Sequence, residues 1–333
     1  MRCPAAVHHA VTIGLLLACA TATAADIPLQ QRIAAVQATA RDAVACVAAQ
    51  PFYWEMGDAT QSLASGAAGR DAPRRDTTMA IASASKWIYA AFVVEQRHGL
   101  LTDVDVAYLT FQSGYSRFRF CRPSQTVAAC QQSPLNGFGR IDASTVGRFD
   151  YSGGHMQKHA LSMGLGALDN DGLGQAIRGG LAPLGITWSF DYRQPQLAGG
   201  GATNAADYAR FLRALMDGTL KLGGQLGTHA VCTNPSACPD QAVKTPIPSV
   251  ENWHYSIGHW VEDDPQVGDG SFSSPGAFGF YPWISADKRT YGLVAREDHR
   301  GVLSTDEAQR PSIESVQCGR QMRAAWMDGV AKP

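Results

Sequence analysis

Apolar residues recur at helical spacing in several long stretches of the chain, separated by polar segments rich in glycine and proline. The first stretch covers residues 27–50 and is closed by Pro51, which cannot continue a helix. A second runs from Ser83 to Gly99, a residue suited to the position after a helix end. Further helices are predicted at residues 155–166, 174–181, 204–216 and 308–330.

Strand-like patterns lie near both ends of the chain. Residues 52–56 and 61–65 flank Gly57-Asp58 and predict a β-hairpin. Three more strands are predicted at residues 255–262, 277–284 and 290–296. Strands at both ends with helices between them predict an α+β fold, in which an antiparallel sheet flanked by helices draws on both termini. We expect its α/β part to comprise residues 26–80 and 250–333, and a helical and loop subdomain to cover about 100–250.

The N-terminus has the features of an export signal. Val11–Ala20 is apolar but too short to span a bilayer, and Ala22-Thr23-Ala24 offers small residues for cleavage after residue 25. Leu16-Leu17-Ala18-Cys19 also matches a lipobox, which would leave a lipid anchor at Cys19. Both alternatives predict a periplasmic or secreted protein. No later stretch is long and apolar enough for a transmembrane helix.

The cysteines favour an oxidising compartment. Of the eight, Cys3 and Cys19 belong to the predicted signal, and six remain in the mature chain. Six cysteines allow 15 pairings. Two pairs lie close in sequence within loop-like segments, which predicts Cys121–Cys130 and Cys232–Cys238. Cys46 and Cys318 are then left to pair, and that disulfide would tie the first helix to the last.

Composition narrows the classes of partner. Of the 333 residues, 45% are hydrophobic, enough for a substantial core, and the formal net charge is −1. Lysine and arginine are scattered rather than clustered, so no basic surface for nucleic acid is expected. Nor does the charge balance indicate a surface for acidic substrates.

The start of the second helix carries parts for nucleophilic catalysis. In Ser83-Ala84-Ser85-Lys86, the lysine lies one helical turn after the serine and on the same face. The helix N-terminus supplies unpaired amide donors for a developing oxyanion. Burial behind Trp87 and Tyr89 would lower the lysine pKa and leave an amine able to accept a proton.

The same spacing occurs a second time, and it shows how weak the motif is alone. Ser285-Ala286-Asp287-Lys288 lies between two predicted strands and has no helix behind it. A polar hairpin turn is the simpler interpretation of that copy.

The order of several segments resembles the serine β-lactamase and penicillin-binding-protein superfamily, in its class C-like branch, which includes esterases and amide hydrolases. Similar segments cover roughly residues 52–330. They are Ser83–Lys86 (S-x-x-K), Leu109–Gly114 (similar to L-L-T-H-T-S-G), Tyr151-Ser152-Gly153 (at the place of Y-x-N), Gly199–Phe211 (similar to the glycine turn and helix), and Ser274-Pro275-Gly276 (at the place of K-T-G or H-x-G).

The resemblance implies a β-lactamase/transpeptidase-like fold and a role for each matching residue. Ser83 would be the acylated nucleophile, and Lys86 and Tyr151 would share the proton transfers. The Ser83 and Ala277 amides would form the oxyanion hole, next to Ser274 and Gly276. His155 and Phe278 are predicted to line the substrate cleft beside them. No cofactor or metal is implied.

Two departures affect the expected substrate. Gly153 replaces the asparagine of Y-x-N, and Ser274 replaces the lysine or histidine of K-T-G or H-x-G. Without that cation, a substrate carboxylate would lose a charge-assisted contact of about 1.5–3 kcal/mol. The sequence therefore favours neutral esters or amides, with a β-lactamase or D-Ala-D-Ala carboxypeptidase as the alternative. A non-catalytic sensor that is acylated without turnover is the alternative from another class.

One pair of histidines has the spacing of metal ligands. His155 and His159 are four residues apart on a predicted helix, a spacing found in metal sites. No glutamate follows His155 and no third ligand is evident, so a metal site is not expected.

Overall fold

The computed structural model describes residues 27–333. The predicted signal segment and Cys19 lie outside these residues. Within the described chain, no helix has the length and apolar character that crossing a membrane requires.

The elements follow the predicted order, with strands near both ends of the chain and helices between them. The helices are α1 (Leu29–Asp42), α2 (Val44–Ala49), α3 (Ser85–Gln96), α4 (Asp103–Leu109), α5 (Val127–Gln131), α6 (Gly154–Ser162), α7 (Asn170–Gly180), α8 (Ala205–Met216) and α9 (Pro311–Asp328). The strands are β1 (Phe52–Gly57), β2 (Ser62–Ala68), β3 (Met79–Ala80), β4 (Phe149–Asp150), β5 (Asp191–Tyr192), β6 (Gly201–Thr203), β7 (Val231–Cys232), β8 (Ala242–Lys244), β9 (His254–Tyr255), β10 (Trp260–Glu262), β11 (Ser271–Ser273), β12 (Tyr281–Ile284) and β13 (Tyr291–Ala295).

An antiparallel sheet drawn from both ends of the chain organises the fold. Its eight strands lie in the order β2-β1-β13-β12-β11-β10-β9-β7. β1 pairs with β2 in the predicted hairpin and with β13 on its other side, where Tyr53 faces Ala295. The mixed helices and antiparallel sheet confirm the predicted α+β class.

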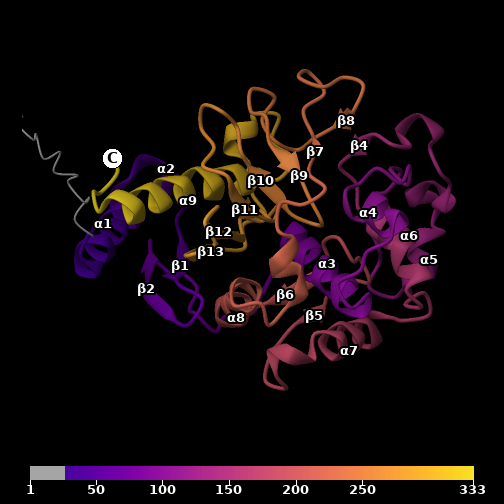
Figure 1. Ribbon diagram of the computed structural model, residues 1–333, viewed down its shortest axis with the longest axis horizontal. Helices are drawn as coiled ribbons and strands as arrows, with labels where there is room; N and C mark the ends of the chain where they lie inside the picture. The colour runs from indigo at the N-terminus through magenta and orange to yellow at the C-terminus, as the bar shows by residue number, and fades with distance from the viewer. Residues whose placement is uncertain (1–26) are drawn as a thin grey trace, which may run out of the picture.

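Helices cover the sheet on both sides. On one side α9 packs on β12 and β13, and α1 and α2 pack against α9; on the other side α8 packs on β1, β12 and β13. Figure 1 shows α1 and α9 side by side at one end of the molecule, with α4, α5, α6 and α7 gathered at the other end. α3 lies between the sheet and this second group of helices. Its residues from Ser85 to Glu95 are all buried.

Three predicted elements differ from the structure, and one strand lies where none is predicted. The first helix divides at Ala43, whose ψ of 136° is extended. The strand predicted over residues 255–262 is two strands, β9 and β10, separated by a turn. The strand predicted from residue 277 begins only at Tyr281, because Gly279 turns with φ +93°. β11 was not predicted because three residues between glycine and proline carry too little pattern.

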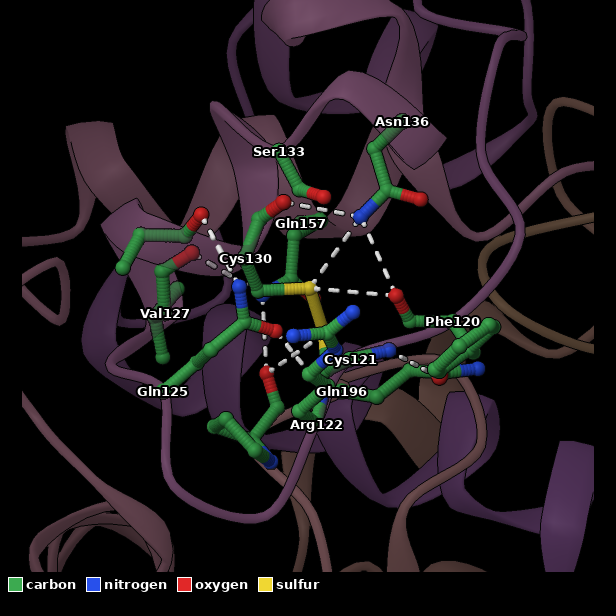
Figure 2. Close-up of a disulfide and its surroundings, with 12 residues drawn as sticks. Phe120, Cys121, Arg122, Gln125, Val127, Cys130, Ser133, Asn136, Gln157 and Gln196 are labelled. Carbon is green, nitrogen blue, oxygen red and sulfur yellow. Dashed lines mark hydrogen bonds between the residues drawn. A yellow bond between two sulfur atoms is a disulfide. The ribbon is translucent and has the colours of Figure 1, made fainter.

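All three predicted disulfides are present. Cys46–Cys318 joins α2 to α9, and Cys232–Cys238 closes a loop after β7. Cys121–Cys130 anchors the long segment before β4. In Figure 2, Asn136 points at this disulfide, and its amide donates to the carbonyl oxygens of Cys130 (2.7 Å) and Phe120 (3.2 Å).

Candidate active site

Ser83 lies on a tight turn between β3 and α3. The turn is a 3₁₀ segment, Ala82–Ala84, that leads directly into the α-helix. Ala82 has φ +43°, a left-handed conformation that costs a residue with a side chain about 1–3 kcal/mol. The Ser85 hydroxyl supports the turn by donating to the Ala82 carbonyl at 2.7 Å. Strain of this kind is typical of functional sites, where the surrounding structure holds it in place.

Close backbone packing stabilises that turn from behind. The Gly201 amide donates to the Ser85 hydroxyl at 3.1 Å, and the Gly201 carbonyl accepts from the Ile81 amide at 3.0 Å. A Cβ on Gly201 would lie 2.6 Å from the Ser85 oxygen, so only glycine fits there. The glycine segment before α8 is therefore part of the support for the Ser83 turn.

Lys86 meets Ser83 inside the protein. The Lys86 side chain is 4% exposed, and its Nζ lies 2.8 Å from the Ser83 Oγ and 2.6 Å from the Ala198 carbonyl oxygen. Burial disfavours the ammonium form and lowers the Lys86 pKa to about 7. A substantial fraction of this amine is therefore uncharged at neutral pH.

Tyr151 approaches the same two residues from a different part of the chain. It follows β4, and its ring centroid lies 4.8 Å from the Lys86 Nζ. The Trp260 ring stacks on it, with centroids 5.3 Å apart. Burial raises the Tyr151 pKa to about 12, although hydrogen bonds with Ser83 and Trp260 offset part of the rise. The phenol therefore keeps its proton at neutral pH.

The segment containing Ser274 and Gly276 lies against the Ser83 turn. The Ser274 hydroxyl donates to the Ser83 carbonyl at 3.1 Å, and Ser274 is only 2% exposed. A Cβ on Gly276 would lie 2.2 Å from the Ile81 carbonyl oxygen, so this close approach requires glycine. Neither the Ser83 amide nor the Ala277 amide donates to another residue of the described chain. Both donors are available for an oxyanion.

A small cavity opens at Ser83. Its volume is about 110 Å³. Its lining is Ser83, Tyr151, Pro246, Ile247, Trp260, Pro275, Ala277, Ser312 and Ile313. None of these side chains carries a formal charge at neutral pH. An adjoining hollow of about 310 Å³ shares Pro246, Ala277 and Ser312 with the cavity and adds Val302, Leu303, Ser304 and Arg310.

Two residues predicted to line the cleft lie elsewhere. His155 is fully buried and is not part of the cavity lining, and its ring hydrogen-bonds with Ser113 and with the Asp150 carbonyl. Phe278 packs on His299, with ring centroids 4.2 Å apart. It lies in the turn before β12 rather than in the strand, so the side-chain alternation expected for a strand does not apply to it.

Other parts of the cavity had no local signal in the sequence. Trp260 lies on a strand and is indistinguishable from a core aromatic by pattern alone. Ile247 belongs to a loop and Ile313 to the first turn of α9, and only the tertiary fold brings them to Ser83. The Ala198 carbonyl is a backbone group and could not be identified from residue type.

The remaining candidate residues have partners within the protein. The His159 ring hydrogen-bonds with Asp105 (2.9 Å) and Tyr89 (3.0 Å). Within residues 27–333, no group of three or more potential ligands is arranged to hold a metal ion. In the second S-x-x-K, the Ser285 hydroxyl bonds to Asp287 and the Lys288 amine to the Gly223 carbonyl, as expected for a turn.

Sequence comparisons do not identify relatives. No family model matches the chain, and a search of curated proteins finds no match.

Comparison of structures does identify similar proteins. A β-lactamase/D-alanine carboxypeptidase from Yersinia pestis, complexed with citrate, superposes with a TM-score of 0.65 at 13% identity, covering 90% of this chain and 99% of that one. A D-amino acid amidase from Ochrobactrum anthropi SV3 gives 0.64 at 13% identity, covering 87% and 100%. EstCE1, a hydrolase with promiscuous acyltransferase activity, gives 0.58 at 14% identity, covering 86% and 99%. At these identities the similarity establishes the fold: this chain has the fold of the serine β-lactamases and transpeptidases.

Proposed function

We propose that this protein is an exported serine hydrolase that forms an acyl-enzyme on Ser83 and hydrolyses carboxylic esters or amides. The observation that carries the proposal is the buried contact of 2.8 Å between the Ser83 Oγ and the Lys86 Nζ. A lysine that only supported the fold would not need a lowered pKa beside a serine on a strained turn.

In the first step, the Ser83 oxygen attacks the substrate carbonyl carbon while its proton passes to the uncharged Lys86 amine. Lys86 is the better base of the two candidates, because its pKa of about 7 leaves it partly deprotonated at neutral pH. Tyr151, with a pKa of about 12, stays protonated and is suited to relaying protons rather than to starting as a tyrosinate. The Ser83 and Ala277 amides would stabilise the oxyanion.

In the second step, the tetrahedral intermediate collapses and the leaving group takes a proton. The Tyr151 hydroxyl gives its proton to the departing oxygen or nitrogen and is reprotonated from the Lys86 ammonium. Water then attacks the acyl-enzyme and gives a proton to Lys86, and the Lys86 ammonium passes that proton to the Ser83 oxygen as the acid leaves. Protons balance over the cycle and no cofactor is required.

The substrate is proposed to be uncharged near the reacting carbonyl. The cavity at Ser83 has no charged lining side chain, and the Ser274 hydroxyl is already bound to the Ser83 carbonyl. The similar structures include an amidase, a hydrolase and a β-lactamase/D-alanine carboxypeptidase, so β-lactam or D-alanyl peptide hydrolysis is the alternative. The lost cation favours neutral esters or amides over that alternative.

Export is part of the proposal. The three disulfides are typical of proteins from oxidising compartments, and the predicted signal segment precedes the folded chain. Whether the mature protein is free or anchored through Cys19 depends on residues outside the described chain.

The decisive experiment is labelling with a fluorophosphonate probe followed by mass spectrometry of the modified peptide. We expect one adduct, on Ser83, and none in Ser83→Ala. Ser285→Ala is the matched control, because it removes the serine of the second S-x-x-K and should leave labelling intact. Labelling that survives Ser83→Ala would refute the proposal.

Turnover assays separate the alternatives. p-Nitrophenyl butyrate should be hydrolysed with steady turnover, and nitrocefin slowly or not at all. Fast nitrocefin hydrolysis would favour the β-lactamase alternative. A burst of p-nitrophenol without steady turnover would favour the acylated sensor.

A further inference from the structure

A buried chain of hydrogen bonds lies directly beneath the Tyr151 loop. The His155 Nδ1 is 2.7 Å from the Ser113 Oγ, and its Nε2 is 3.0 Å from the carbonyl oxygen of Asp150, the residue before Tyr151. His155 is 0% exposed. The imidazole therefore joins the loop after α4 to the loop that carries Tyr151.

The partners of His155 fix one tautomer. The Asp150 carbonyl can only accept, so the His155 Nε2 must carry the hydrogen and donate it. The neutral ring then presents an unprotonated Nδ1, which accepts from the Ser113 hydroxyl. Burial lowers the His155 pKa to about 3, which keeps the ring neutral. The Asp150 carbonyl thus fixes the tautomer, and the Ser113 hydroxyl satisfies the ring nitrogen that this tautomer leaves unprotonated.

Phe111 supports the same arrangement at a cost in backbone strain. Its φ is +60°, which is rare for a residue with a bulky side chain. Its carbonyl accepts from the Asp150 amide at 3.1 Å. Its ring stacks on His155, with centroids 5.3 Å apart, and meets the Tyr151 ring edge-on, also at 5.3 Å. The strained residue therefore contacts both the histidine and the tyrosine.

We propose that His155 is a positioning residue that, held in one tautomer and orientation by Asp150 and Ser113, keeps Tyr151 where its hydroxyl can pass a proton to the leaving group. The inference rests on the proposed function, because it gives His155 an effect only through Tyr151. Asp150, the residue before Tyr151, is held by Phe111 at its amide and by His155 at its carbonyl, and the Tyr151 amide donates to the Lys244 carbonyl at 3.0 Å. Removing the His155 bond leaves the Asp150 carbonyl without its partner, so the peptide leading into Tyr151 keeps only one of its two hydrogen bonds.

His159 provides a matched control. It lies one turn further along α6, is also 0% exposed, and also hydrogen-bonds through both ring nitrogens. Its partners, Tyr89 and Asp105, have no hydrogen bond to the Tyr151 loop. If the loss of any buried histidine impairs the protein, substitutions at His155 and His159 should have the same effect. If the effect comes from Tyr151 positioning, only the His155 substitution should slow the reaction that needs Tyr151.

The test uses two esters with the same acyl group, a p-nitrophenyl ester and an ethyl ester. p-Nitrophenolate leaves without protonation, whereas ethoxide needs a proton, so the ethyl ester reports on Tyr151. We expect Ser113→Ala and His155→Gln to lower kcat on the ethyl ester about 10- to 100-fold, with KM nearly unchanged, and on the p-nitrophenyl ester less than about 3-fold. Ser113→Thr, which keeps the hydroxyl, should restore the ethyl-ester rate. His159→Gln should not change the ratio of the two rates.

Tyr151→Phe separates failure of this inference from failure of the proposed function. If Tyr151→Phe leaves ethyl-ester hydrolysis intact, the proposed role of Tyr151 is wrong. If it slows that reaction but Ser113→Ala and His155→Gln do not, the positioning role is overturned. Combining His155→Gln with Tyr151→Phe should give no further loss, and full additivity would also refute the inference. Ser113→Ala removes only one hydroxyl group from a loop, so it tests the positioning role even if His155→Gln does not fold.

Discussion

Burial shifts the pKa values of Lys86 and Tyr151 in opposite directions. The same desolvation lowers the Lys86 pKa and raises that of Tyr151, because one group is charged when protonated and the other when deprotonated. At neutral pH the pair therefore contains an amine that can accept a proton and a phenol that still holds one. This division of roles is what an acyl transfer needs.

The Lys86 pKa sets the expected pH dependence. Below pH 7 the ammonium form prevails and cannot accept the Ser83 proton, so kcat/KM should fall about tenfold per pH unit. Above pH 7 the rate should level off, because the Lys86 amine is then mostly uncharged. Measuring kcat/KM for p-nitrophenyl butyrate from pH 5 to 9 checks this. A rate independent of pH below 7 would argue against Lys86 as the base.

Residue types alone suggested some of this arrangement and not the rest. Ser83, Lys86 and Tyr151 lie together as the sequence predicted. The helical spacing of Ser83 and Lys86 and the order of segments that includes Tyr151 can both be recognised in the sequence alone. The sequence predicts His155 in the cleft, yet this side chain is buried and does not line the cavity. The sequence could place His155 on α6 but could not show which way that helix faces, since its other neighbours come from distant loops.

Among elements, the segment before α8 supports the Ser83 turn through backbone contacts. A Cβ on Gly201 would lie 2.6 Å from the Ser85 oxygen and 2.7 Å from the Phe190 ring. We expect Gly201→Ala to destabilise the protein by about 1–3 kcal/mol and to reduce activity further by displacing the turn. Denaturant unfolding and the p-nitrophenyl butyrate rate measure the two effects.

Gly179→Ala is the control for that substitution. Gly179 lies in α7 with open space where its Cβ would go, so alanine should be neutral or stabilise the helix by up to about 1 kcal/mol. If Gly201→Ala behaves in the same way, the close packing behind Ser83 is not important for stability.

Element boundaries show where sequence patterns lose information. Long amphipathic stretches such as α8 were predicted nearly to the residue, and Asn204 caps it by accepting from the Asp207 amide. The bounds of short strands were not predicted as well, because β11 has only three residues and β12 begins only after a glycine turn. Pairing with neighbouring strands, rather than local preference, determines where these strands begin and end.

For the whole molecule, the disulfides constrain the unfolded chain to different extents. Cys46–Cys318 spans 272 residues, whereas Cys232–Cys238 spans six. In the chain-entropy model the long loop contributes about 5 kcal/mol and the short one about 2 kcal/mol. The double variant Cys46→Ser/Cys318→Ser should therefore lose clearly more unfolding free energy than Cys232→Ser/Cys238→Ser. Equal losses in urea unfolding would show that local strain or packing, rather than loop length, decides the contribution.

The cavity at Ser83 is assembled from parts of the chain that are far apart, and its size limits the substrate. Its volume of about 110 Å³ is smaller than the ~150 Å³ that accommodates benzene in an apolar protein cavity. Ile247 and Ile313 form part of its wall, and Ile313 comes from the first turn of α9. A small apolar substituent should therefore fit beside the reacting carbonyl, while larger groups must extend into the adjoining hollow.

This limit predicts a steep dependence on substrate size. Across p-nitrophenyl esters from acetate to decanoate, kcat/KM should peak at short acyl chains and fall for long ones. Ile313→Ala should shift the peak towards longer chains by enlarging the cavity, at a cost of about 2–5 kcal/mol in stability if the site does not collapse. Leu100→Ala is the matched control, since Leu100 is 79% exposed and lines neither the cavity nor the adjoining hollow, so its loss should not move the peak. A profile that stays flat in the parent protein and in Ile313→Ala alike would mean that this cavity does not receive the acyl chain.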